Sequence, residues 1–354
     1  MGIDALRTWQ QQDGAHVTQD DPTVVAHYGD SFGEYQAVLQ STALFEISAA
    51  GRIWLRDRDR AALLHRLSTN NIEALVAGQG TQTVLTNHNG RIIDLLTVYV
   101  FANELLIVTS PRQGSTVLNL LRKNIFFNDR VIIEDASETL GQFALYGPHS
   151  TTLLQQLTGM MLDNLPLHAI TTATIDDTSL WIARSKPLGG MGFALYIPVE
   201  RLASIWTRLR QAGAQPLGQI AYECLRVEAG YGAYGRELSL DYIPLETGLW
   251  DAISFTKGCY VGQEIIARME SRNRIARHLC GLKLNGRVDA PRTLAVAGKD
   301  AGNLTSVVES PRLGPIGLAY VRHAYAAPGT QLDIVDSAVR GEVVTLPFAT
   351  GSER

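Results

Sequence analysis

The stretch GTQTVLTNHNGRIIDLLTVYVFANELLIVTS, residues 80–110, decides the fold class. It contains three apolar runs of strand-like composition, joined by HNGR and ANEL. An Asn-Gly pair between two such runs is a strong hairpin signal, so Asn89 and Gly90 predict that the first two runs pair antiparallel. Neighbouring strands joined by hairpins favour an α+β fold with mixed or antiparallel sheets over a doubly wound parallel sheet.

The sequence on either side of this stretch alternates between strand and helix patterns. Upstream, Ile53 and Leu55 alternate with charged residues, and the segment 57–67 carries apolar residues at helical spacing. Downstream, STVLNLLRKNIF predicts another helix. A strand followed by a helix is predicted twice more, in ALYGPHSTTLLQQLTG (residues 144–159) and GFALYIPVERLASIWTRLRQAG (residues 192–213).

The carboxyl-terminal part of the chain has a different sequence pattern. From about Leu279 onward, short apolar runs are cut by Gly and Pro at regular intervals, and no long helix fits. This pattern is typical of a small all-β barrel. We therefore expect two domains, an α+β body over residues 1–277 and a β-barrel over residues 278–354.

Composition and charge exclude several classes of protein. The 354 residues are 45% hydrophobic and 19% charged, as in ordinary globular proteins, and the net charge of −4 argues against binding nucleic acid by bulk electrostatics. No run of about 18 apolar residues exists, so we expect no membrane span and assign no membrane partner. The polar amino-terminal segment has no signal or transit pattern, and three cysteines form no even disulfide framework. A reducing cytoplasm is the expected location.

Several familiar motifs are absent or lack their context. GYGAYG, residues 230–235, matches G-x-G-x-x-G but follows a helical pattern, so helix-capping and turn glycines are the better interpretation. The eight histidines form no H-x-x-x-H set and the cysteines no C-x-x-C pair, so no metal site is expected. Three dispersed cysteines cannot supply the four thiolates of an iron–sulfur cluster within one chain, although ligation shared across two chains stays open.

Two charged residues in apolar patterns are candidates for a binding site. Asp94 interrupts an apolar β run and lies either at the exposed start of a strand or inside a pocket, where a carboxylate without partners would be costly. Arg226 lies near the end of the helix predicted over residues 218–230. Its simplest interpretation is a surface ion pair with Glu223 at i,i+3, worth about a few tenths of a kcal/mol.

The segment TKGCYVGQE, residues 256–264, holds the one cysteine that does not read as a buried apolar residue, because Cys224 and Cys280 lie in apolar patterns. Gly258 and Gly262 keep the backbone around Cys259 approachable. A thiol two residues from Lys257 has an electropositive neighbour.

A helix is also expected to begin near Gly262, because Val261, Ile265 and Met269 recur at i,i+4. Gln263 and Glu264 would occupy its first turn. A helix N-terminus increases the thiolate fraction of a cysteine placed just before it, although Glu264 opposes that effect. This favours a thiol that is reactive or that itself serves as a ligand, and the alternative is a packed turn cysteine.

KGCYVGQE closely resembles the K-G-C-(F/Y)-x-G-Q-E signature of the YgfZ-type folate-binding proteins. That group belongs to the superfamily of the glycine cleavage T-protein, an aminomethyltransferase that uses tetrahydrofolate. The likeness covers almost the whole chain. Its other segments are ALFEISAAGRIWLRDRDRAALLHRLSTNNI, NGRIIDLLTVYV, ALYGPHS, CLRVEAGYGAYGREL, PLETGLWDAISF, AGNLTSVVESPRLGPIGLAYVR and GEVVTLPF.

The resemblance implies a T-protein-like α+β body of interwoven subdomains around a central folate pocket, with a carboxyl-terminal β-barrel. Asp94 matches the first residue of the T-protein aspartate pair, which lies beside the reactive pterin nitrogen. Arg226 matches an arginine that lines the folate pocket, and Trp250 matches an aromatic residue near it. Arg226 or Lys257 would pair with the carboxylates of the folate tail.

The sequence also departs from the T-protein pattern. Leu95 stands where the second aspartate belongs, and LGGMGFALY, residues 188–196, lacks the pocket carboxylate of the G-Y-T-G-E motif. True aminomethyltransferases lack the K-G-C signature. The resemblance therefore implies a pocket that binds folate while its one-carbon chemistry is impaired or absent, so a conventional enzyme is not the first expectation.

The function that the resemblance implies is support for the assembly or repair of 4Fe–4S clusters, notably in radical-SAM enzymes that modify tRNA. Its partners would be tetrahydrofolate, the iron–sulfur machinery and client enzymes, with no direct contact to nucleic acid. Cys259 would be the working thiol, as transient cluster ligand, persulfide carrier or redox partner, and Lys257 would favour its thiolate. The residues expected to orient the loop are Gly258, Tyr260, Gly262, Gln263 and Glu264.

Two other functions compete with this one. A folate-dependent aminomethyltransferase or demethylating enzyme would form methylenetetrahydrofolate from an aminomethyl donor. A folate-storing or docking module would tolerate Cys259→Ser without effect.

Overall fold

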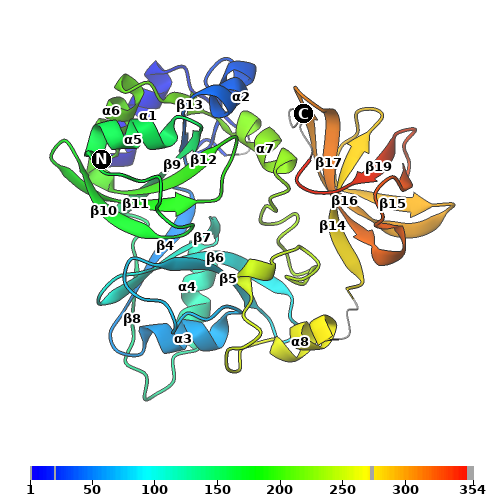
Figure 1. Cartoon of the computed structure of the whole chain (residues 1–354), viewed down its shortest axis with the longest axis horizontal. Coiled ribbons are helices and arrows are strands. Elements are labelled where there is room, and N and C mark those ends of the chain that lie inside the picture. Colours follow the sequence, from blue (N-terminus) through cyan, green and yellow to red (C-terminus); the bar gives the residue numbers. More distant parts are fainter. Residues whose placement is uncertain (1, 20, 272–274, 349–354) are drawn as a thin grey trace. The chain divides into compact units, whose positions relative to one another are not determined.

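The computed structural model describes residues 2–19, 21–271 and 275–348, and these form two compact units (Figure 1). The first unit comprises residues 1–83 and 95–222, and the second comprises residues 84–94 and 223–354. The hairpin tip formed by residues 84–94 therefore belongs to the second unit, although the residues on both sides of it belong to the first.

A six-stranded sheet with the strand order β10-β11-β12-β9-β3-β13 forms the larger layer of the first unit. All of its pairs are antiparallel except β13 with β3, which run parallel. The strands are β3 (Ala43–Glu46), β9 (Leu140–Gly147), β10 (Ile170–Ile175), β11 (Thr178–Ser185), β12 (Met191–Pro198) and β13 (Gln215–Leu217). A separate two-stranded sheet pairs β1 (His16–Val17) with β2 (Val25–His27).

Strand β12 shows how one strand serves two cores. Phe193 and Leu195 pack with helices α1 (Gly2–Gln12), α5 (Ser150–Thr158) and α6 (Leu202–Gln211). Ala194 and Tyr196, on the opposite face, belong to a second cluster together with residues of the five-stranded sheet. Successive side chains of a strand point to opposite faces, so a continuous apolar run is what a strand buried on both faces requires.

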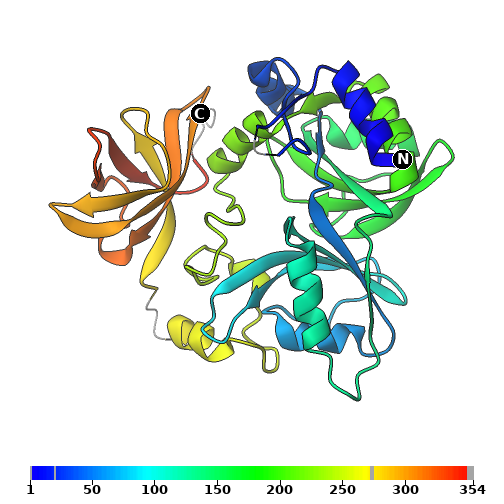
Figure 2. The same cartoon turned by 180° about the vertical axis from the view of Figure 1, so that it is seen from behind.

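The five-stranded sheet, with the order β5-β6-β7-β4-β8, contains the stretch that predicted the fold class. Its strands are β4 (Ala50–Arg56), β5 (Gly80–Thr86), β6 (Ile92–Val100), β7 (Glu104–Pro111) and β8 (Ile132–Asp135). Helix α4 (Gly114–Lys123) contacts β4 and β7, and α3 (Arg60–Leu67) contacts β7 (Figure 2). Helix α2 (Ser31–Gln40) contacts strands of the six-stranded sheet.

A closed barrel of six antiparallel strands, in the order β14-β17-β16-β15-β18-β19, ends the second unit. It follows helices α7 (Gln219–Glu228) and α8 (Gln263–Ser271). The barrel strands are β14 (Arg277–Leu284), β15 (Arg292–Val296), β16 (Lys299–Ser310), β17 (Gly314–Arg322), β18 (Gln331–Ile334) and β19 (Arg340–Val344). Short 3-10 turns lie at Val199–Arg201, Trp250–Ala252 and His323–Tyr325.

The α+β body and the carboxyl-terminal barrel that the sequence predicted are confirmed. The hairpin at Asn89 and Gly90 is confirmed too, and Gly90 has φ +68°. The division between residues 277 and 278 stays a proposal, because compactness groups the barrel with residues 84–94 and 223–276 as well. Among the described residues, no helix is long and apolar enough to cross a membrane.

A histidine pair at the start of the barrel predicts a dependence of stability on pH. His278 Nε2 lies 2.9 Å from His323 Nδ1, and burial, followed by the charge of His323, lowers the pKa of His278. Just below the ordinary histidine pKa of 6.5, the unfolded chain therefore binds more protons than the folded one. The stability that neutral His278 contributes is present above that pH and is lost as the pH falls through the lowered pKa.

We expect the free energy of unfolding, measured with urea, to decrease between about pH 7 and about pH 5 by less in His278→Gln than in the wild type. The exposed His88→Gln is the control and should follow the wild-type curve. If the free energy of unfolding changed equally with pH in all three proteins, the histidine pair would not contribute to the pH dependence of stability.

Candidate functional site

Asp94 lies on strand β6, in the part of the hairpin that belongs to the second unit, and its side chain is 0% exposed. The alternative that it stands at an exposed strand start is therefore wrong. Alternation along the strand places Asp94 on the same face as Ile92 and Leu96, which are also fully buried. A carboxylate withdrawn from water interacts strongly with any charged or N–H group beside it, and Asp94 already has a partner within the protein, so a ligand would contact it by replacing or sharing that partner.

The K-G-C loop, residues 256–262, packs against the turn of the same hairpin. The hydroxyl of Thr86 donates to the carbonyl of Val261 over 2.6 Å. Gly262 has φ +83°, and a Cβ there would lie 2.6 Å from the carbonyl oxygen of Asn87. The structure thus brings the strand of Asp94 and the cysteine loop together in one unit, and this close approach requires glycine at position 262.

The hairpin is held from its other side by the segment that precedes the K-G-C loop. The N–H of Ile92 donates to the carbonyl of Tyr242 over 3.0 Å, and the guanidinium of Arg91 donates to the carbonyl of Asp241. Two segments far downstream therefore fix the backbone at the start of β6, two residues before Asp94.

Cys259 is the exposed cysteine of the three, whereas Cys224 and Cys280 are buried. Helix α8 begins at Gln263 with Glu264 in its first turn, which confirms the predicted helix start. Gly258 is exposed, and a Cβ there would have nothing within 4 Å, so this glycine is not required by close packing. The thiol therefore lies on an accessible loop just before a helix.

Lys257 is buried, and its Nζ lies 5.1 Å from the centre of the Tyr260 ring. Tyr260 is buried in a cluster with Ile253 and Ile266, and burial raises its pKa to about 12. Lys257 and Tyr260 therefore form a cation–π contact that anchors the loop. An effect of Lys257 on the thiol of Cys259 stays a prediction.

Arg226 is buried rather than on the surface, so the sequence-based picture of a surface ion pair is wrong in that respect. The pairing itself is present: Nε and Nη2 donate to the two carboxylate oxygens of Glu223, over 3.2 and 2.8 Å. Nη1 donates to the carbonyl of Tyr231 and to Glu237, and Nη2 also donates to Ser306. All five N–H donors are engaged, so a folate carboxylate would have to displace one of these partners.

Glu237 is the centre of this network, and no sequence pattern indicated it. The carboxylate is 0% exposed and accepts hydrogen bonds from the backbone of Ala233 and from Thr305 and Ser306, besides Arg226. Thr305 reaches it because a bulge in β16 falls between Leu304 and Ser306. A lone Glu in an irregular segment has no periodicity, so only the tertiary contacts reveal its role.

Two neighbouring arginines favour the ionised form of Glu223. Burial opposes ionisation of Glu223, but Arg226 and Arg236 outweigh that effect and lower the pKa of its carboxyl. Arg236 Nη2 lies 2.6 Å from Glu223 Oε2. The network therefore joins helix α7 and the following loop to the barrel within the second unit.

Trp250 lies in the 3-10 turn Trp250–Ala252 and is 44% exposed. The exposed ring of Phe255 lies beside it, with 6.1 Å between the ring centres. The pair presents aromatic surface on the segment that leads into the K-G-C loop, as contact with a planar ligand would require. The ring contact that the structure gives for Trp250 joins it to Phe255.

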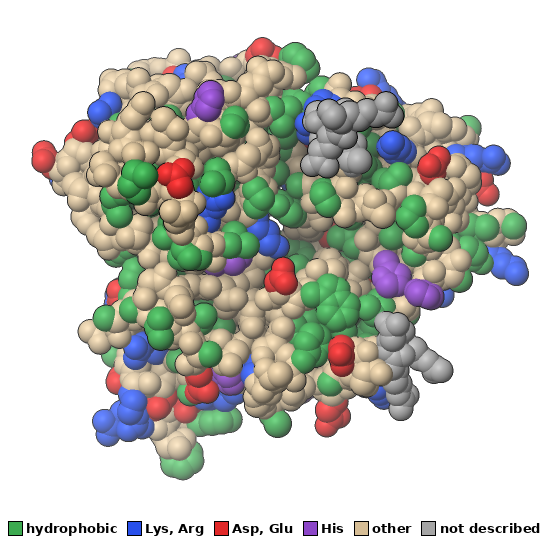
Figure 3. All heavy atoms as spheres, in the orientation of Figure 1, with side chains coloured by type: hydrophobic (Ala, Val, Ile, Leu, Met, Phe, Trp, Pro, Cys, Tyr) green, Lys and Arg blue, Asp and Glu red, His purple; other side chains and the backbone are tan. Residues whose placement is uncertain are grey.

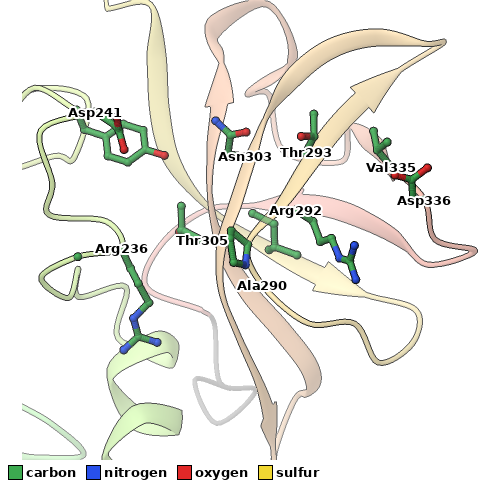
Figure 4. A pocket seen from close by; sticks show the side chains of 13 residues that line it. Arg236, Asp241, Ala290, Arg292, Thr293, Asn303, Thr305, Val335 and Asp336 are labelled. Carbon is green, nitrogen blue, oxygen red and sulfur yellow. The ribbon is translucent and has the colours of Figure 1, made fainter. Parts of the chain in front are cut away.

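A separate pocket of about 580 Å³ lies in the second unit and does not coincide with the predicted site (Figure 4). Asp241 comes from the loop before the barrel, and Asn303 and Thr305 come from β16. The guanidinium of Arg236 points away toward α7, where it pairs with Glu223. None of the residues proposed from the sequence lines this pocket.

Within the described ranges, no group of three or more His, Cys, Asp or Glu side chains is arranged to hold a metal ion. Cys259 could therefore contribute one ligand to a cluster held jointly with a partner, but the described residues around it provide no complete set.

Comparisons with known proteins find similarity over nearly the whole chain. The model of the GCVT N-terminal domain matches residues 11–257, and the model of the glycine cleavage T-protein C-terminal barrel domain matches residues 277–349. A chloroplastic protein of Arabidopsis thaliana that carries the provisional name of a transferase is 32% identical over 95% of this chain and 77% of its own length. An aminomethyltransferase of Halothermothrix orenii is 32% identical over 91% of this chain and 92% of its own length.

The fold has a close counterpart among solved structures. The glycine cleavage system aminomethyltransferase T of Bartonella henselae superposes with a TM-score of 0.88, covering 98% of this chain and 97% of that one. The two sequences are 21% identical, so this likeness shows the shared fold alone.

Proposed function

We propose, from the premise that the chain belongs to the GCVT N-terminal domain family and carries the T-protein barrel domain, that it binds a reduced folate and transfers a one-carbon group to or from it. The relatives named aminomethyltransferase favour this function over the iron–sulfur role that the K-G-C signature suggested. The observation that carries the proposal is the fully buried carboxylate of Asp94 on a hairpin held by two distant segments.

The residues present fit a folate in part. A carboxylate withdrawn from water suits the N–H groups of a pterin, and the exposed ring of Trp250 suits a planar group. Arg226 fits less well, because its donors are already engaged. When bound, a reduced folate supplies the nitrogen atoms that carry the one-carbon group.

Asp94 has two tasks in this proposal. Its carboxylate orients a ligand N–H by accepting a hydrogen bond, and a carboxylate oxygen takes up or returns a proton at the nitrogen beside it. Burial keeps water away and strengthens both interactions. Neither Leu95 nor the segment 188–196 supplies a second carboxylate, so Asp94 is expected to be indispensable.

The test is folate binding and turnover by Asp94→Asn, which keeps the shape of the side chain and removes its charge. Calorimetric titration with 5-formyltetrahydrofolate should give a Kd about 10- to 150-fold weaker than that of the wild type, the value of a hydrogen bond to a charged group. Formation of methylenetetrahydrofolate from an aminomethyl donor should fall by about 10²-fold or more.

Asp289→Asn, at an exposed position, is the matched control and should bind folate like the wild type. Equal binding by Asp94→Asn, with its stability to urea unchanged, would remove Asp94 from the site. A wild-type protein that binds folate without any turnover would leave the binding part of the proposal and remove the transferase part.

A second candidate function, support of 4Fe–4S cluster assembly or repair in radical-SAM enzymes, is favoured by one observation. Cys259 is exposed on a loop at the start of a helix, where a thiol can reach a partner protein. Because one thiolate cannot hold a cluster, the chain would share ligation with a partner or carry sulfur transiently. A cytoplasmic location goes with this function and stays a prediction.

Complementation tests the second function. In a bacterium without its own YgfZ-type protein, the wild-type chain should restore methylthiolated nucleosides in tRNA, and Cys259→Ser at equal abundance should not. Ser254→Ala, in the segment just before the K-G-C loop, is the control and should restore them. Equal rescue by Cys259→Ser would reduce the cysteine to a structural or docking role.

A further inference from the structure

The loop that joins α4 to β8, residues 124–131, presents two adjacent aromatic side chains to solvent. Phe126 is 58% exposed and Phe127 is 104% exposed, whereas most large apolar residues of the first unit are buried. The loop lies at the end of the first unit farthest from its six-stranded sheet (Figures 1 and 2). In Figure 3, green apolar atoms end the lowest projection of the view, with blue basic side chains nearby.

Hydrogen bonds and an ion pair hold this tip in a defined turn. The N–H of Asp129 donates to the carbonyl of Phe126 over 3.0 Å, so Phe127 occupies the apex of the turn. The N–H of Phe126 donates back to the carboxylate of Asp129 over 2.7 Å. Arg66, on helix α3, binds both Asp129 and the carbonyl of Asn124, and its guanidinium lies 4.3 Å from the Phe126 ring centre. The turn is therefore fixed at its base while its apex is in water.

The acidic and basic side chains around the tip differ in whether a partner of opposite charge compensates them. The N–H of Phe126 and the guanidinium of Arg66 hold the pKa of Asp129 below its ordinary value, so this carboxylate is ionised and already compensated. Arg122 and Lys123 are exposed and form no ion pair in the part of the chain that the structure describes, whereas the exposed Arg130 lies near the carboxylate of Asp59, which also accepts a hydrogen bond from its backbone N–H. Apolar rings at an apex with uncompensated cations around its base are suited to an interface that is apolar inside and anionic outside.

We propose that this tip docks on an anionic lipid surface, with Phe126 and Phe127 entering the interfacial region and Arg122, Lys123 and Arg130 meeting the headgroups. A folded protein partner fits less well, because a stable interface buries about 800 Å² on each partner and needs complementary shape. Here the apolar part is a single convex turn, which a bilayer accepts without complementary shape. The contact is peripheral, so it needs no membrane-spanning helix, and it departs from the expectation that the protein has no membrane partner.

The test is co-sedimentation of the full chain with vesicles of phosphatidylcholine alone and with about 30% phosphatidylglycerol added. Binding is expected only with the anionic vesicles at low ionic strength, and it should weaken as salt screens the cations. Phe126→Ser with Phe127→Ser should lower the partition coefficient by about tenfold or more for each ring. Arg122→Gln, Lys123→Gln and Arg130→Gln should lower it by about fivefold for each charge.

Two controls keep the result specific. Met161→Ser removes another exposed apolar side chain of the first unit, 74% exposed, and Arg201→Gln removes an exposed cation, so both should bind like the wild type. Phe127→Trp should add quenching by brominated lipid beyond that of the five native tryptophans.

The proposal is overturned if the wild-type chain does not sediment with anionic vesicles, or if the double phenylalanine variant sediments equally well. It is also overturned if that variant changes only the molar mass measured by light scattering, which would make the tip a contact between copies of the chain. Folate binding by the same variants should not change, which separates this result from the proposed function.

Discussion

Glu237→Ala is expected to lower the free energy of unfolding by about 3–5 kcal/mol, the usual cost of removing one partner from a buried ion pair. The substitution leaves Arg226 buried and removes the common acceptor of Ala233, Thr305 and Ser306. The hydroxyl of Thr305 can still donate to the carbonyl of Leu318, but the donors of Ala233 and Ser306 lose their acceptor, and each adds its own desolvation cost. Urea unfolding followed by circular dichroism measures the loss, with refolding checked so that the value is an equilibrium quantity.

The matched control is Glu309→Ala, because Glu309 also pairs with an arginine, Arg287, but both side chains are exposed. Exposed pairs contribute about 0–1 kcal/mol, so this variant should remain close to the wild type. A loss below about 1 kcal/mol for Glu237→Ala would mean that water replaces the missing carboxylate, and the network would then not join α7 to the barrel in the way described.

Native alkylation is expected to label one cysteine of three, with a selectivity of about 100-fold or more. Burial raises the pKa of Cys224 to about 12, with a further contribution from Glu228, and it raises the pKa of Cys280 to about 11. At pH 8 these groups carry roughly 10⁻⁴ and 10⁻³ of their thiol as thiolate, the form that reacts. Cys259 is exposed and reacts without local unfolding.

Intact-mass analysis after treatment with iodoacetamide should show one adduct on the native wild-type chain, none on Cys259→Ser and three on the wild-type chain unfolded in urea. The unfolded sample is the control for reagent and time. Labelling of Cys224 or Cys280 at a rate comparable to that of Cys259 in the folded protein would contradict their burial.

Local sequence patterns are sufficient to indicate several features of this fold without knowledge of its tertiary contacts. The Asn-Gly turn at residues 89–90 and the helix start at Gln263 depend on residues close in sequence. The carboxyl-terminal barrel is indicated by short apolar runs that Gly and Pro interrupt at regular intervals. Such signals survive in a single sequence because propensity, turn chemistry and patterning act over a few residues. The exposure of Cys259 relative to Cys224 and Cys280 followed from the same kind of pattern.

Contacts between distant segments decided the rest. The burial of Asp94 depends on the whole sheet, and its proximity to the K-G-C loop depends on hydrogen bonds that join residues 86–92 to residues 241–261. A sequence does not state the partners of a buried charge, because the free energy of burial is set by whichever groups the fold brings near it. The spacing of Arg226 and Glu223 therefore indicated a surface ion pair, whereas the structure buries Arg226 and engages all of its N–H donors. Glu237, which no sequence pattern indicated, is the central acceptor of that hydrogen-bond network.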